Sequence, residues 1–229
     1  MEDNTCKLIL LGNGSVGKSS IIARFVKDGF TRVYKQTVGL DFFEKRLTLR
    51  GDLRLLCQVW DIGGQSINSP MLSKYISGAD VIFLCYDVTD PDSFADVDDW
   101  HTLVLRTFQK METKDLPKLH LIGNKIDLIQ LRKITENMHA KCIVEKRMQG
   151  GEFMSAMNGD NVLKSFYRVA GQMAGITLSE YELAFTEKVI AATITDGGEE
   201  GRTAYADAIE KEDRENEANK LKGCACSMQ

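Results

Sequence analysis

The 229-residue sequence lacks the features that mark exported, myristoylated and membrane-spanning chains. Residues 1–4 are acidic, and no apolar segment of the signal-peptide type follows them. Glu2 stands where N-myristoylation requires a glycine. No apolar run reaches the roughly 18 residues that a transmembrane helix needs. We therefore expect the chain to be cytoplasmic.

Disulfide frameworks and zinc sites are missing as well. Of the six cysteines, only Cys224 and Cys226 are closely spaced. Cys57 and Cys85 lie in apolar runs, where cysteine behaves as a small buried side chain. This distribution is typical of a reduced, intracellular protein.

A basic stripe is also absent, so we expect no nucleic-acid partner. The formal net charge is −4, and residues 176–229 carry 12 acidic and 6 basic side chains. Residues 178–193 keep some helical spacing, but residues 195–222 contain few large apolar residues, which is typical of a solvated tail. The predicted domain boundary therefore follows residue 175.

One eight-residue stretch carries the strongest signal that is present. Residues 12–19 read Gly-Asn-Gly-Ser-Val-Gly-Lys-Ser, the G-x-x-x-x-G-K-S pattern of a phosphate-binding loop. An apolar run precedes it and helical spacing follows, so its N–H groups would face an anion at a helix N-terminus. Lys18 would bring a charge to the β- and γ-phosphates, and the Ser19 hydroxyl would ligate Mg²⁺. The residues expected to contact the nucleotide here are Gly14, Ser15, Val16, Gly17, Lys18, Ser19 and Ser20.

A second motif bears on the choice of base. Residues 124–127 read Asn-Lys-Ile-Asp and directly follow an apolar run. The Asp127 carboxylate can accept two hydrogen bonds from guanine, whereas adenine would leave it unpaired. Asn124 would brace the loop, with Lys125 beside it. Because α/β sites form at the carboxyl ends of strands, the motif predicts a guanine-selective site.

A third motif, residues 61–65, reads Asp-Ile-Gly-Gly-Gln. Asp61 can hold Mg²⁺ through a water molecule, the Gly64 N–H can meet a γ-phosphate, and Gln65 can orient the attacking water. Gln65 is therefore the candidate catalytic residue. Thr37 offers a hydroxyl and an N–H that only Mg²⁺ and a γ-phosphate would satisfy. The candidate metal set is Ser19, Thr37 and Asp61.

Apolar runs that alternate with helical patterns predict the fold. The expected strands are residues 7–11, 41–50, 53–60, 81–86, 119–123 and 152–155. The expected helices are residues 17–28, a short one ending near 77, then 91–111, 135–148 and 159–174. This order predicts an α/β chain of the P-loop NTPase type, a three-layer sandwich. Its six-stranded, mostly parallel sheet would carry helices on both faces.

In these ordered motifs the chain resembles the Ras superfamily of small GTPases over residues 7–175. Residues 37–42, 60–61, 78–80 and 84–89 look like Rab signatures. Residues 41–43, residues 62–65 and the C-terminus look closest to the divergent Rab twenty-eight branch. The resemblance implies a GTPase domain at residues 1–175 and a flexible, acidic hypervariable tail at 176–229. It also implies a slow GTP-to-GDP switch that regulates membrane or vesicle trafficking.

The resemblance implies further contacts to the nucleotide. Phe30 would pack against the base, and Tyr34 would close over the phosphates. Ser155, Ala156 and Met157 match the family's Ser-Ala-Lys loop except at Met157. Methionine keeps apolar contact with guanine but brings no ammonium, so we expect slightly weaker, still guanine-selective binding.

Protein partners are implied as well. An exchange factor, a GTPase-activating protein and effectors would act on the switch. No internal arginine stands out, so the activating protein would supply one. Effectors would contact the ordered loops together with Phe42 and Trp60, although core packing is an equal alternative for Trp60.

The C-terminus predicts attachment to the cytosolic face of a membrane. Residues 226–229 read Cys-Ser-Met-Gln, a C-a-a-X motif whose final glutamine favours a farnesyl group on Cys226. One prenyl chain anchors only marginally, and the acidic stretch upstream provides no basic patch. The second signal would be palmitoylation of Cys224, or the attachment would be reversible, with a soluble prenyl-binding carrier. The candidate locations are an endosome and the base of a cilium or flagellum.

Three other functions stay open at this point. An ATP-dependent enzyme is disfavoured by Asn124 and Asp127. A GTP-binding module with negligible hydrolysis is disfavoured by the presence of Lys18, Thr37 and Gln65. A Ras-type signalling GTPase fits the C-terminus as well as a Rab-type protein does.

Overall fold

The computed structural model describes residues 4–27, 40–64, 71–111 and 116–184. The chain divides into two compact units, residues 1–183 and 184–229, and the elements that follow belong to the first. They are β1 (Asn4–Leu11), α1 (Lys18–Lys27), β2 (Leu40–Thr48), β3 (Arg54–Ile62), α2 (Leu72–Ile76), β4 (Val81–Asp87), α3 (Pro91–Ala95), α4 (Val97–Lys110), β5 (Lys118–Asn124), η2 (Ile129–Leu131), α5 (Glu136–Glu145), β6 (Gly150–Met154) and α6 (Val162–Met173).

A six-stranded sheet in the order β2-β3-β1-β4-β5-β6 forms the centre of this unit. All neighbouring strands are parallel except β2 and β3, which pair antiparallel through the predicted hairpin. Gly51 and Asp52 make the turn with φ values of 77° and 56°, a left-handed conformation that glycine favours. The prediction of a six-stranded, mostly parallel sheet is confirmed.

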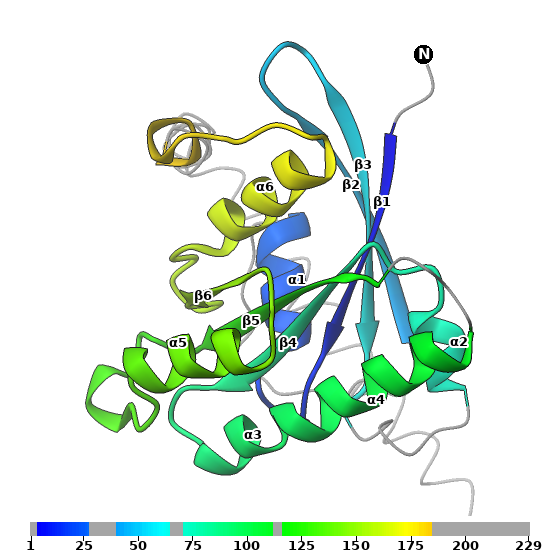
Figure 1. Cartoon of the computed structure of the whole chain (residues 1–229). Coiled ribbons are helices and arrows are strands. Elements are labelled where there is room, and N and C mark those ends of the chain that lie inside the picture. The colour runs from blue at the N-terminus through cyan, green and yellow to red at the C-terminus, as the bar shows by residue number, and fades with distance from the viewer. Residues whose placement is uncertain (1–3, 28–39, 65–70, 112–115, 185–229) are drawn as a thin grey trace, which may run out of the picture. The chain divides into compact units, whose positions relative to one another are not determined.

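Helices cover both faces of the sheet because β1 and β4 are apolar on both sides. Ile9 and Leu11 belong to a buried cluster that includes side chains of α2, α4 and α5. On the other face, Phe25 of α1 stacks on Phe166 of α6 with ring centroids 3.8 Å apart. Burial of such side chains contributes about 1.5–3 kcal/mol each. Figure 1 shows α4 and α6 on opposite sides of the strands.

The predicted helix at residues 91–111 is two helices that meet at Asp96. Asp90 caps the first, since its side chain accepts a hydrogen bond from the Asp92 N–H at 3.1 Å. Pro91 occupies the first turn, as predicted. Asp96 closes α3 and immediately precedes α4, and its carboxylate accepts a hydrogen bond from Asn13, as described below. The helical period continues through this junction, which is why the sequence pattern does not reveal it.

Five of the six strands are longer than predicted, whereas β2 ends at Thr48, two residues before the predicted end at residue 50. β1 begins at Asn4 rather than at residue 7, because residues 4–6 pair in register with Leu55, Leu56 and Cys57 of β3. β3 continues to Ile62, so Asp61 lies within the strand, at its carboxyl end. Among the described residues, no helix is long and apolar enough to cross a membrane.

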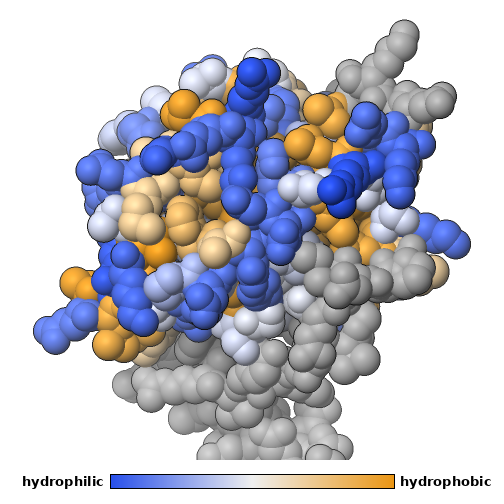
Figure 2. Space-filling model, turned by 60° about the horizontal axis from the view of Figure 1, so that its bottom comes forward, coloured by the Kyte–Doolittle hydropathy of each residue, from blue (hydrophilic) through white to orange (hydrophobic). Residues whose placement is uncertain are grey.

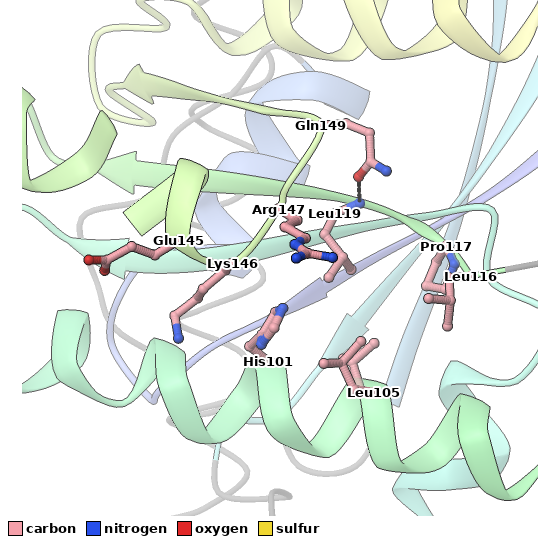
Figure 3. Close-up of a pocket in the computed structure, with 10 residues that line it drawn as sticks. His101, Leu105, Leu116, Pro117, Leu119, Glu145, Lys146, Arg147 and Gln149 are labelled. Atoms are coloured by element: carbon pink, nitrogen blue, oxygen red, sulfur yellow. Dashed lines mark hydrogen bonds between the residues drawn. The ribbon is translucent and has the colours of Figure 1, made fainter. Parts of the chain in front are cut away.

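The carboxyl ends of the parallel strands lie on the lower side of Figure 1. Figure 2 turns this side forward and shows polar side chains around smaller apolar patches. A separate cavity of about 280 Å³ lies beside the amino end of β5 (Figure 3). Leu105, Leu116, Leu119, Lys146 and Arg147 are among the residues that line it. This cavity therefore lies away from the strand ends where the sequence motifs meet.

Candidate functional site

The phosphate-binding motif forms the loop between β1 and α1, and two of its glycines are required by close contacts. Gly12 has φ 141°, and a Cβ there would lie 2.1 Å from the Cys85 carbonyl oxygen. Gly17 has φ 97°, and its Cβ would lie 2.2 Å from Nδ2 of Asn124. Any side chain at either position would therefore push the loop away from β4 or β5.

The loop leads directly into the first turn of α1. The helix begins at Lys18, and its first internal bond runs from the Ile21 N–H to the Gly17 carbonyl at 2.9 Å. The first turn of the helix, which carries the N–H groups of Lys18, Ser19 and Ser20, precedes that bond. N–H groups in this position suit an anion such as a phosphate. Gly14, Ser15 and Val16 form the preceding bend, with Ser15 at φ 63°.

The backbone of the phosphate-binding loop holds the Lys18 side chain in place. Its side chain is buried, and Nζ donates to the carbonyl oxygens of Gly12 at 2.7 Å and Asn13 at 2.8 Å. Burial lowers the pKa of Lys18, while Cys85 and Asp61 oppose that shift. An ammonium has three donors, so one remains for a ligand oxygen.

Ser19 and Asp61 bring two oxygen ligands together. The Ser19 hydroxyl donates to Oδ2 of Asp61 at 2.5 Å, which joins the first turn of α1 to the end of β3. The described residues contain no group of three or more His, Cys, Asp or Glu side chains that could hold a metal by themselves. Mg²⁺ usually takes one or two protein oxygens and completes its shell with phosphates and water, so this pair fits it.

Asn124 connects the phosphate loop to the loop after β6. It is fully buried; its Nδ2 donates to the Val16 carbonyl at 2.8 Å, and its Oδ1 accepts from the Ala156 N–H at 3.1 Å. This is a bracing contact of the kind that its place in the motif suggests. Because one side chain bonds to the backbone of both loops, it fixes the position of the phosphate loop relative to the loop after β6.

Asp127 is oriented by the loop after β6. The buried hydroxyl of Ser155 donates to its Oδ1 at 2.5 Å, and the same hydroxyl accepts from the Asn158 N–H at 3.1 Å. A carboxylate can accept several hydrogen bonds, so Asp127 keeps acceptor capacity for a ligand. Met157 follows in this loop and is 41% exposed, which leaves its side chain accessible to a ligand.

Lys125 is placed beside the site by an ion pair. It has φ 70°, and its Nζ lies 2.7 Å from Oδ2 of Asp87 at the end of β4. The other oxygen of Asp87 accepts from the N–H and the hydroxyl of Thr89, each at 2.8 Å. The Lys125 ammonium thus connects the motif at residues 124–127 to the carboxyl end of β4.

Gly64 approaches the phosphate loop closely. A Cβ at Gly64 would lie 2.2 Å from the Gly14 nitrogen and 2.3 Å from the Asn13 carbonyl carbon. The segment after β3 therefore begins in contact with the phosphate loop, and only glycine permits this approach.

Several predicted site residues lie outside the described residues, so their roles stay predictions. They are Phe30, Tyr34, Thr37, Gln65, Cys224 and Cys226.

Sequence reasoning missed a contact between the phosphate loop and α4. Asn13 donates through Nδ2 to Oδ2 of Asp96 at 2.6 Å and accepts at Oδ1 from Nε1 of Trp100 at 3.0 Å. Asn13 occupies a variable position of the motif. The only signal in the sequence is a side chain there that can both donate and accept.

Comparison with known proteins agrees with this geometry. The model of the Ras family matches residues 7–175, a span that includes every motif contact above. Ras-related protein Rab-28 of Caenorhabditis elegans is 36% identical over 205 residues, which cover 90% of this chain and 82% of that protein. Ypt/Rab-type GTPase YPT7 of Saccharomyces cerevisiae is 34% identical over 170 residues, 74% of this chain and 81% of that protein. The predicted resemblance is confirmed: the chain belongs to the Ras family of small GTPases, in its Rab branch, and is a GTP-binding, GTP-hydrolysing switch of the kind that regulates membrane trafficking.

Proposed function

We propose that this chain performs its switch function with one nucleotide that spans the loop after β1 and the loops after β5 and β6. The observation that carries this proposal is the double contact of Asn124, which bonds to Val16 and Ala156 at once. A nucleotide has phosphates at one end and a base at the other, and this brace holds one binding loop for each.

At the phosphate end, the N–H groups of residues 14–20 surround the β-phosphate, and Lys18 donates to the β- and γ-phosphates. Ser19, Thr37 and, through water, Asp61 would hold Mg²⁺. When bound, the metal neutralises charge on the phosphate oxygens. Lys18 needs little reorganisation for its role, because two carbonyl groups already orient its ammonium.

At the base end, Asp127 accepts the two guanine donors while Ser155 holds the carboxylate in position. The Ala156 N–H is engaged by Asn124, which fixes the backbone that carries Met157. Met157 and Phe30 supply apolar contact with the base, Lys125 borders it, and Tyr34 covers the phosphates. Guanine is preferred because adenine offers Asp127, which is half-buried, no matching pair of donors.

Hydrolysis depends on Gln65, which orients the attacking water. Thr37 and Gly64 hold the γ-phosphate, so its loss releases the two segments that carry them. A GTPase-activating protein supplies the missing arginine, a contribution of about 10³–10⁵ in rate in related enzymes. Effectors contact the ordered segments together with Phe42, which is 46% exposed and meets Trp60 edge-on.

Gln65→Leu is expected to slow hydrolysis without weakening GTP binding, because leucine cannot orient a water molecule. Single-turnover phosphate release measures the first quantity, and equilibrium binding of a non-hydrolysable GTP analogue measures the second. Gln109→Leu, a matched change at an exposed position of α4, should leave both unchanged. Hydrolysis by Gln65→Leu at the unmutated rate would show that Gln65 is not catalytic.

We further propose that a farnesyl group on Cys226 attaches the protein reversibly to the cytosolic face of a membrane. The acidic tail opposes binding to an anionic leaflet, so one prenyl chain gives a weak attachment. A soluble carrier that shields the farnesyl group fits such cycling. The alternative is palmitoylation of Cys224, which would give a more stable attachment. An endosome and the base of a cilium or flagellum are the proposed locations.

Cys226→Ser is expected to make the protein fully cytosolic, whereas Cys224→Ser should have a smaller effect. The two serine variants differ by two positions in the same tail, so each is the control for the other. Fractionation of eukaryotic cells measures the distribution, and intact-mass analysis should find one farnesyl group with the last three residues removed. An unmodified chain that still ends in Gln229 contradicts the proposed anchor.

A further inference from the structure

We infer that Asn13 is a positioning residue that ties the phosphate loop to helix α4 and thereby slows nucleotide release. The inference rests on the proposed nucleotide site. It assigns a role to a position that the motif leaves variable.

Both polar atoms of the Asn13 side chain form hydrogen bonds. Its amide nitrogen donates to the Asp96 carboxylate at 2.6 Å, and its amide oxygen accepts from the Trp100 indole at 3.0 Å. Trp100 is fully buried, so its N–H depends on a protein partner. A hydrogen bond to a carboxylate is also stronger than one between neutral groups. Together these contacts fix the side chain to one end of α4.

The backbone of Asn13 meets the residues that act on the phosphates. Its carbonyl oxygen accepts from the Lys18 ammonium at 2.8 Å. On the same peptide unit, a Cβ at Gly64 would come within 2.3 Å of the carbonyl carbon, so Gly64 lies in direct contact. A displacement of Asn13 would therefore shift Lys18, and it would also change the contact between Asn13 and Gly64.

The contacts of Asn13 with Asp96 and Trp100, which we call the clamp, lie at the junction of α3 and α4. The chain ends one helix at Ala95 and begins the next at Val97, so Asp96 stands between two helix ends. Its carboxylate faces the phosphate loop and accepts the hydrogen bond from Asn13. Trp100, one helical turn later, lies on the same face of α4. Movement of α4 would thus be transmitted to the phosphate loop through Asn13.

A double-mutant cycle on GDP release tests this role in the full-length protein. Asn13→Ala is expected to accelerate release of a fluorescent GDP analogue about 10- to 100-fold, the range that loss of a hydrogen bond to a charged group implies. Asp96→Ala should also accelerate release. Because the two side chains act as one contact, the double variant should release GDP no faster than the faster single variant.

Asp99→Ala is the matched control. Asp99 is an exposed aspartate in the first turn of α4, and its side chain forms no hydrogen bond or ion pair in the described part of the chain. Asp99→Ala should leave the rate of GDP release unchanged. The double variant Asn13→Ala/Asp99→Ala should therefore release GDP at the rate of Asn13→Ala alone.

Trp100 offers a second readout that general destabilisation would not reproduce. The chain has two tryptophans, so Trp60→Phe leaves Trp100 as the only indole. Its emission should change when nucleotide is removed with a chelator, because Asn13 links the indole to the loop. Asn13→Ala should abolish that change while the protein remains folded by circular dichroism.

The outcomes separate this role from the site itself. Failure of the unmutated protein to retain GDP would overturn both the site and the clamp. Retention of GDP, combined with unchanged release from Asn13→Ala or strictly additive effects of Asn13→Ala and Asp96→Ala, would overturn the clamp alone.

Discussion

Asp127→Asn is expected to abolish the preference for guanine and to shift binding toward xanthine nucleotides. The carboxylate of Asp127 is oriented by the Ser155 hydroxyl at 2.5 Å and can accept both guanine donors. An amide at this position offers a donor instead, which suits the exocyclic oxygen of xanthine. The loss of two hydrogen bonds to a charged group implies GTP binding weaker by about 10²–10⁴-fold.

Competition of GTP, XTP and ATP for the purified protein measures this change. The unmutated protein should prefer GTP to ATP by about 10⁴–10⁵, the range found for sites built to hydrogen-bond a group that the competing ligand lacks. Asp160→Asn, the same change at an exposed position of the loop after β6, should keep the preference for GTP. If Asp127→Asn still selects GTP over XTP, Asp127 does not recognise the base.

Lys18→Ala is expected to weaken binding of GTP and GDP alike. The Lys18 ammonium is buried and held by two carbonyl groups, so the phosphates that it contacts would lose a preorganised partner. Truncating one member of a buried charge pair costs about 2–5 kcal/mol, which is roughly 30- to 5,000-fold in affinity.

Isothermal titration calorimetry with GDP and Mg²⁺ measures this loss. Lys141→Ala is the matched control, because the Lys141 side chain is 75% exposed and pairs with Glu145 one turn away on the same helix. Lys18→Ala removes the donor to the carbonyl oxygen of the buried Gly12, so circular dichroism must show that the variant is folded before its affinity is compared. GDP binding equal to that of the unmutated protein would exclude Lys18 from the phosphate site.

The fold was predictable because its main signals are local. β1, β4 and β5 carry apolar runs, β3 alternates apolar with polar residues, and the helices between the strands carry apolar residues at helical spacing. The junction at Asp96 was not predictable, because the helical period runs through it without interruption. The first three residues of β1 were missed for a different reason: they are strand because β3 pairs with them, not because they are apolar.

The candidate site was predictable to the extent that motifs encode it. The pairing of Ser19 with Asp61 and the brace by Asn124 join segments whose places in the sheet follow from their order in the chain. The ion pair of Lys125 with Asp87 and the clamp by Asn13 could not be read from the sequence. Their partners lie 38 and 83 positions away in the chain, and neither pair belongs to a common pattern.

The central claim is that this chain holds a guanine nucleotide in the site braced by Asn124. Denaturing the freshly purified protein and separating the released nucleotides by chromatography tests it most directly. We expect GDP or GTP in an amount comparable to that of the protein, and a marked loss of both from Asp127→Asn and Lys18→Ala. Release of adenine nucleotides, or of no nucleotide from protein purified with Mg²⁺ throughout, would contradict it.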